Sequence, residues 1–205
     1  MAEPIHRSEK TVLHRPDPNL SFAVSVCGKD EVDGFALGAV THLLSIEDPG
    51  TAKATPLWFK GVHRQIHFHD VESRYEARMM NATMATREQV AEILRFGDTC
   101  RRASLRRPVH LLIHCYAGAS RSTAACYAIV AQTLGPGSAV AALDFVLRIR
   151  PEAYPNSLVV EYADHFLARN GELVEALQPL RRAFHDAANA WLAALQEPER
   201  PPRKK

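Results

Sequence analysis

The sequence lacks a long hydrophobic segment. Its longest apolar run, AACYAIVA at residues 124–131, is far shorter than the about 20 residues that a membrane-spanning helix needs. The first ten residues, MAEPIHRSEK, also lack the apolar stretch of a secretory signal peptide. These absences predict a cytoplasmic protein with no membrane partner.

A strong excess of charge of one sign is absent too. The 205 residues include 25 lysines and arginines against 23 aspartates and glutamates, a formal net charge of +2. This balance gives no indication of a nucleic-acid partner. Cysteine is scarce, and the four cysteines do not have the CxxC spacing of a zinc site. We therefore expect neither a metal nor another cofactor.

The sequence does contain an order of strands first and helices later, without internal repeats. Buried strands are predicted at residues 21–27, 39–46, 64–70 and 109–115, the last with the continuous apolar character of a parallel sheet. Helices are predicted from a Thr86–Gln89 capping box to about residue 105, and at 121–134, 138–150 and 157–169. This order predicts a single α/β domain, with a central, mostly parallel sheet of about four or five strands flanked by helices and a helix-rich C-terminal half.

The stretch LLIHCYAGASRST, residues 111–123, leads from a buried strand through a short loop into a helix. Backbone N–H groups of such a loop and of the helix start converge on one concavity, which favours an anion. Gly118 lets the backbone approach a ligand closely. A thiol placed there loses its proton easily, and an arginine can offer two parallel donors to an oxyanion. Cys115 and Arg121 therefore predict attack of sulfur on a phosphoryl group.

The segment HCYAGASRST resembles the signature loop of the cysteine-dependent protein tyrosine phosphatases, especially their compact dual-specificity branch. The stretch from HFHDVES to RPEAYPNSLVVEYADHFLARNGEL is similar to small bacterial tyrosine-phosphatase-like proteins, and the resemblance covers about residues 20–175. It implies hydrolysis of phosphotyrosine, with phosphoserine and phosphothreonine as further candidates, through a phospho-cysteine intermediate. The implied partner is a phosphorylated protein or a small phosphomonoester.

The resemblance also implies a role for each matching residue. Cys115 matches the nucleophile, Arg121 the phosphate-binding arginine, and Ser122 the hydroxyl that stabilises the departing thiolate. His114 matches the histidine that orders the loop, and Asn156 the asparagine that supports it from behind. The phosphate-binding loop comprises Tyr116, Ala117, Gly118, Ala119, Ser120 and Arg121.

In this family the general acid is an aspartate just after a strand upstream of the cysteine. Asp70, at the end of the predicted strand 64–70, fits that position. Its separation from Cys115 is longer than in compact members, and the extra residues are expected within 72–83. Glu72 and Glu76 are the alternative acids.

Composition divides the chain into four segments. We expect an extended arm at residues 1–19, the catalytic domain at 20–175, a C-terminal helical extension packed on that domain at 176–196, and a disordered tail at 197–205. Pro179 should restart or kink the last helix, because proline does not fit a helix interior without strain.

Two other functions compete with the phosphatase. A rhodanese-like sulfurtransferase also places a cysteine at the head of an anion-binding loop, and a non-catalytic phosphate-binding module needs only the loop. Within the phosphatase hypothesis a lipid substrate stays open, although the absence of lysine from the loop favours a monophosphate. The sequence leaves the oligomeric state open, and also whether another cysteine forms a redox pair with Cys115.

Overall fold

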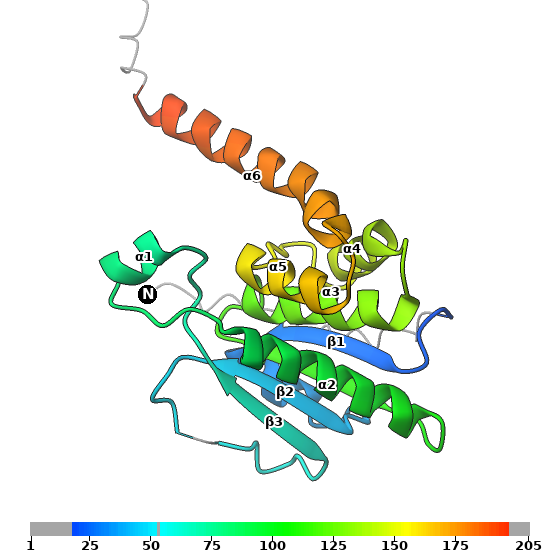
Figure 1. Ribbon diagram of the computed structural model, residues 1–205. Helices are drawn as coiled ribbons and strands as arrows, with labels where there is room; N and C mark the ends of the chain where they lie inside the picture. The colour runs from blue at the N-terminus through cyan, green and yellow to red at the C-terminus, as the bar shows by residue number, and fades with distance from the viewer. Residues whose placement is uncertain (1–17, 53, 197–205) are drawn as a thin grey trace, which may run out of the picture.

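The computed structural model describes residues 18–52 and 54–196, so most of the predicted arm and the predicted tail lie outside it. Its centre is a four-stranded sheet in the order β1-β4-β2-β3 (Figure 1). The strands are β1 (Ala23–Gly28), β4 (His110–Cys115), β2 (His42–Glu47) and β3 (Val62–His67). Every pairing is parallel, so the four strands end at one edge of the sheet. The predicted parallel sheet is confirmed.

Five helices lie on one side of the sheet (Figure 1). They are α2 (Arg87–Ser104), α3 (Arg121–Leu134), α4 (Ala139–Ile149), α5 (Ser157–Phe166) and α6 (Glu172–Gln196). Helix α3 is buried from Arg121 to Ala131, because it packs on β4 and β1 and also against α2, α4 and α5. The predicted helix-rich C-terminal half is confirmed.

The opposite face of the sheet has a different cover. It consists of the short 3-10 helix η1 (Lys29–Phe35) and the segment that leads from β2 to β3. A small apolar cluster lies between this cover and the sheet, formed by Cys27, Val32, Leu43, Phe59 and Leu112. Since Leu112 belongs to this cluster and Leu111 and Ile113 to the larger core, β4 is buried on both faces, as its continuous apolar sequence predicts.

The segment between β3 and α2 holds an additional short helix, α1 (Arg74–Met79), within the residues where extra length is expected (Figure 1). The predicted Thr86–Gln89 capping box is present at the start of α2. Its Gln89 side chain also donates from Nε2 to the carbonyl oxygen of His67, at 2.7 Å. This bond fastens the start of α2 to the end of β3.

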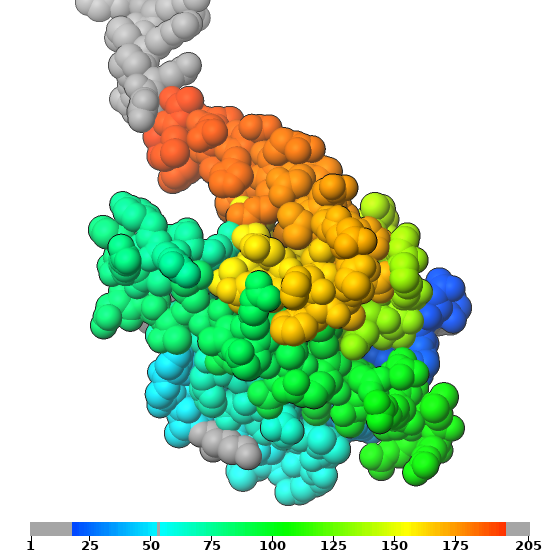
Figure 2. All heavy atoms as spheres, in the orientation of Figure 1, coloured from blue at the N-terminus to red at the C-terminus, as the bar shows by residue number. Residues whose placement is uncertain are grey.

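Helix α6 continues through Pro179, so the restart predicted there is not found. Leu173 and Leu177, in its first turns, are buried in the core. Phe184 and Trp191 are largely exposed, and the end of the helix projects from the rest of the molecule (Figure 2). Packing of the first turns thus outweighs the one backbone hydrogen bond that proline removes. Within residues 18–52 and 54–196, no helix is long and apolar enough to cross a membrane.

Candidate active site

The loop between β4 and α3 is fixed against the end of β1. Gly118 has a φ of +73°, and a Cβ atom there would lie 2.5 Å from backbone atoms of Cys27 and Gly28. Only glycine fits such a position. On the same side, the N–H of Lys29 donates to the carbonyl oxygen of Tyr116 at 2.9 Å. The shape of the loop therefore depends on close backbone contact with β1.

Cys115 is the last residue of β4, and its side chain is buried inside the loop. The N–H of Gly118 donates to Sγ at 3.3 Å, and Ser122 Oγ lies 3.1 Å from the same sulfur. Ser122 stands in the first turn of α3, where the helix dipole adds positive potential. A backbone N–H, a hydroxyl group and the start of a helix thus surround one sulfur.

Arg121 is the first residue of α3, and its guanidinium is buried. Nη1 donates to Asp48 Oδ1 at 2.6 Å and to the carbonyl oxygen of Phe68 at 2.7 Å. Among the described residues, Nε of Arg121 is buried and has no hydrogen-bond partner. An oxyanion in the loop would supply that partner, because a guanidinium can offer Nε and Nη2 together to two oxygens.

Asp70 lies beside the loop. Its Oδ1 accepts hydrogen bonds from Ser120 Oγ at 2.6 Å and from Asn156 Nδ2 at 3.0 Å. The residue as a whole is exposed to solvent. The fold thus brings an accessible carboxyl group to the loop across 50 residues of sequence.

Asn156 connects α5, Asp70 and the loop. Its Oδ1 accepts from the N–H of Val159 at 3.1 Å, so Asn156 caps the start of α5. Its Nδ2 donates to Asp70, and its backbone N–H donates to the carbonyl oxygen of Ser120 at 3.4 Å. Asn156 is fully buried, and its bond with Val159 forms away from water.

The two alternative acids, Glu72 and Glu76, form hydrogen bonds with groups outside the loop. Glu72 accepts from Arg181 at both oxygens, at 3.0 Å and 2.6 Å, and Oε1 also accepts from the N–H of Ser157 at 2.7 Å. Burial alone would raise the pKa of Glu72, but the hydrogen bonds from Arg181 and Ser157 outweigh burial and lower that pKa. Glu76 accepts from the N–H groups of Glu72 and Ser73, at the start of α1. These contacts make both glutamates weaker candidates for the acid than Asp70.

Through Arg181, helix α6 contacts two segments near the site, the one after β3 that holds Glu72 and the one before α5 that holds Tyr154. Besides its bonds to Glu72, the Arg181 guanidinium lies 4.8 Å from the centre of the Tyr154 ring. The same ring stacks on Phe184 with centroids 4.4 Å apart. The backbone N–H of Tyr154 in turn donates to the loop carbonyl of Ala119 at 2.7 Å. One arginine of α6 therefore links the segment after β3 to the segment that supports the loop.

His114 lies on the other face of the sheet, away from α3. Its Nε2 is 2.6 Å from Ser45 Oγ on β2, and that oxygen is 2.8 Å from His63 Nε2 on β3. Burial lowers the pKa of His114, so the imidazole is neutral near neutral pH. The ring thus fastens the strand that carries Cys115 to β2, and Ser45 continues the link to β3.

The other three cysteines, Cys27, Cys100 and Cys126, are buried and form no disulfide. Burial raises the pKa of each of these thiols, that of Cys100 to about 12. Across the described part of the chain, no group of three histidine, cysteine, aspartate or glutamate side chains is placed to hold a metal ion.

Comparison with solved structures identifies the fold. DUSP15 superposes with a TM-score of 0.54 and 18% sequence identity, over 80% of this chain and 94% of that chain. The Yvh1 phosphatase domain from Chaetomium thermophilum matches with a TM-score of 0.53 and 23% identity, over 78% of this chain and 97% of that domain. Human DUSP28 matches with a TM-score of 0.51 and 16% identity, over 82% of this chain and 96% of that chain. This chain has the fold of the dual-specificity phosphatases. By sequence, no family model and no curated protein matches it.

Asp48 is a site residue that the sequence motifs do not predict. Asp48 follows β2 directly and binds Arg121, at the edge of the sheet where β4 delivers Cys115. The signal was present in the sequence, because the carboxyl ends of parallel strands form the ligand-binding edge of such sheets. An acidic residue directly behind a buried strand is therefore a candidate for this edge.

Proposed function

We propose that this protein is a cysteine-dependent phosphatase that hydrolyses phosphotyrosine, with phosphoserine and phosphothreonine as further candidate substrates. The observation that carries the proposal is the set of contacts around one sulfur. Cys115 Sγ has Gly118 N–H and Ser122 Oγ as neighbours. Beside the same loop, Nε of Arg121 is buried and has no partner among the residues that the structure describes. A nucleophile and an anion-binding loop in one place suit phosphoryl transfer to sulfur.

In the first step the Cys115 thiolate attacks phosphorus while the bond from phosphorus to the substrate oxygen breaks. Asp70, held against the loop by Ser120 and Asn156, gives its proton to the departing oxygen. Backbone N–H groups of the loop and the Arg121 guanidinium bind the three remaining phosphoryl oxygens. The products are the dephosphorylated hydroxyl group and a phospho-cysteine.

In the second step water attacks the phospho-cysteine. Asp70, now ionised, takes a proton from that water, and the bond from phosphorus to sulfur breaks. The Ser122 hydroxyl, 3.1 Å from Sγ, donates a hydrogen bond to the departing thiolate. Inorganic phosphate leaves, and Cys115 and Asp70 return to their starting states.

The competing functions differ from this proposal in a measurable product. A sulfurtransferase would release sulfite from thiosulfate, and a non-catalytic module would bind phosphate without releasing any. The dual-specificity phosphatase fold and the placement of Asp70 beside the loop support the phosphatase over both. No observation favours a lipid substrate.

The test is an assay of wild type and Cys115→Ser on an aryl phosphate and on a phosphotyrosine peptide, with thiosulfate in parallel. The proposal expects phosphate release by wild type from both phosphate esters and none by the variant, which should remain folded because serine is nearly isosteric with cysteine. Release of sulfite from thiosulfate without release of phosphate would contradict it. Equal phosphate release by the variant would also contradict it.

A further inference from the structure

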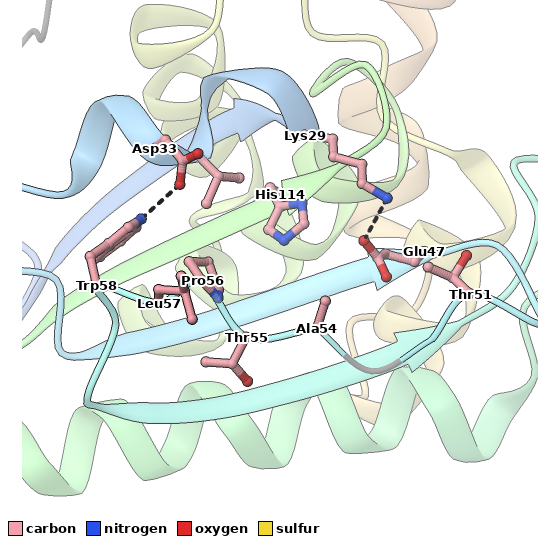
Figure 3. Close-up of a pocket in the computed structure, with 11 residues that line it drawn as sticks. Lys29, Asp33, Glu47, Thr51, Ala54, Thr55, Pro56, Leu57, Trp58 and His114 are labelled. Atoms are coloured by element: carbon pink, nitrogen blue, oxygen red, sulfur yellow. Dashed lines mark hydrogen bonds and ion pairs between the residues drawn. The ribbon is translucent and has the colours of Figure 1, made fainter.

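A cavity of about 540 Å³ lies on the face of the sheet opposite the helix layer, between η1 and the segment before β3 (Figure 3). Its volume is within the range of about 300–1,000 Å³ that is typical of ligand pockets. It is lined by Lys29, Val32, Asp33, Glu47, Thr51, Ala54, Thr55, Pro56, Leu57, Trp58 and His114. The proposed reaction uses none of its apolar lining.

The cavity begins beside the phosphate-binding loop. Lys29 lines it with its side chain, while its backbone N–H donates to the loop carbonyl of Tyr116 at 2.9 Å. Glu47 lines it too, and the next residue along the chain is Asp48, which binds Arg121. The cavity therefore lies next to the loop in which a substrate would place its phosphate.

The charges of the cavity favour a cation. Lys29 Nζ pairs with Glu47 Oε1 at 3.3 Å, so these two charges compensate each other (Figure 3). Asp33, on the side of η1, accepts a hydrogen bond from Trp58 Nε1 at 2.9 Å. Within residues 18–52 and 54–196, no ion pair joins Asp33 to a cation. The cavity thus offers one uncompensated carboxylate next to an indole ring, and both attract a cation.

The remaining lining suits a long aliphatic chain. Val32 and Pro56 supply apolar surface on two sides, and Leu57 adds a side chain that is otherwise fully exposed. Arginine and lysine pack their methylene groups on such surfaces while the charged end reaches a polar partner. The phosphate-binding loop suits an anion and this cavity suits a cation. The two neighbouring sites together therefore prefer a substrate that carries a phosphate and, close to it, a positively charged side chain.

We propose that this cavity binds the side chain of an arginine or lysine that flanks the phosphorylated residue of a protein substrate, with its charge between Asp33 and Trp58. This inference rests on the proposed phosphatase function and adds a substrate class to it, phosphorylated segments with a basic neighbour. It assigns η1 and the segment before β3 to substrate selection.

The experiment uses phosphotyrosine peptides that carry a single arginine at each position from three before to three after the phosphotyrosine. Each has a twin with citrulline, the uncharged isostere. The measured quantity is the ratio of kcat/KM between twins at low and high salt. We expect arginine to be preferred about fivefold or more at one or two positions, the order of effect of one partly exposed charge contact. High salt should reduce the preference.

Asp33→Asn removes the charge and keeps an oxygen for the bond from Trp58, so it should bring the arginine-to-citrulline ratio close to one. Asp30→Asn is the matched control, because Asp30 is an exposed acid of the same helix η1 that does not line the cavity. It should leave the ratio unchanged, and an aryl phosphate should be hydrolysed equally by both variants. Two outcomes would overturn this inference and leave the proposed function standing. One is an enzyme that hydrolyses the peptides but does not prefer arginine over citrulline, and the other is a preference for arginine that persists in Asp33→Asn. Absence of activity on every phosphate ester would overturn the proposed function as well.

Discussion

Arg181 donates hydrogen bonds to both carboxylate oxygens of Glu72, at 3.0 Å and 2.6 Å, although 109 residues separate the two in the chain. The pair joins α6 to the segment that follows β3 and carries Asp70. Both side chains are mostly buried, with 18% and 22% of their surface exposed. An ion pair with this geometry is worth more than an ordinary surface pair, because solvent screens it less.

Glu72→Gln should lower the free energy of unfolding at pH 7 by about 1 kcal/mol, since it removes the charge from this pair. The pKa of Glu72 is lower in the folded protein than its ordinary value of 4.5. Its ionised form therefore stabilises the fold above pH 4.5, and this contribution is lost as the pH falls toward the folded pKa.

Urea unfolding of wild type and Glu72→Gln at several pH values checks this prediction. The difference between the two proteins should be largest at neutral pH and shrink below pH 4.5. Glu161→Gln, an exposed glutamate of α5, is the control and should show little difference at any pH. A Glu72→Gln difference that stays constant with pH would contradict the assigned ion pair.

Asp70→Asn should lower kcat on phosphotyrosine by roughly 10²–10⁴-fold, the usual contribution of general acid–base catalysis. The loss should be smaller on an aryl phosphate whose leaving group departs without a proton. Steady-state kinetics on the two substrates measure the difference. An equal loss on both would mean that Asp70 acts only through the structure of the loop, to which Ser120 and Asn156 bind it.

Arg121→Lys should lower kcat by roughly 10²-fold or more, because an ammonium keeps the charge but loses the planar pair of donors. Asp48→Asn should have a milder effect, since asparagine can still accept the bond from Nη1 that holds the guanidinium. Measuring kcat for both variants and wild type under the same conditions checks this prediction. If the two variants lost activity equally, Asp48 would do more than hold Arg121.

Iodoacetate near neutral pH should alkylate Cys115 first and inactivate the enzyme. The other three cysteines are buried and burial raises their pKa, so few of those thiols are ionised. Inorganic phosphate should slow the reaction by occupying the loop. Peptide mass spectrometry identifies the modified residue, and modification of Cys27, Cys100 or Cys126 at the same rate would refute the assignment.

The sequence predicts those parts of the site that depend on local structure. Cys115, Gly118 and Arg121 lie within one strand–loop–helix unit, and each residue type has a physical reason to stand there. The family resemblance implies Asp70, because the general acid of that family follows a strand upstream of the cysteine. Asp48 also follows a strand, β2, but it lies outside the segments whose motifs carry the resemblance.

Contacts between distant segments could not be predicted in this way. Nothing in the sequence around Arg181 indicates that it binds Glu72, and the bond from Ser45 to His114 depends on which strands become neighbours in the sheet. Pro179 illustrates the same limit. Its local preference predicts an interruption, yet burial of Leu173 and Leu177 keeps the helix continuous.

The central claim is that Cys115 becomes covalently phosphorylated. Ser122→Ala tests it most directly, because loss of the hydroxyl 3.1 Å from Sγ should slow release of the thiolate more than its attack. The variant is mixed with an aryl phosphate, quenched in acid and digested, and the peptides are analysed by mass spectrometry. We predict a burst of released phenol equal to the amount of enzyme and a phosphate group on Cys115. Both should be absent from the double variant that carries Cys115→Ser together with Ser122→Ala. Steady turnover by Ser122→Ala with no burst and no phosphorylated Cys115 would contradict the account.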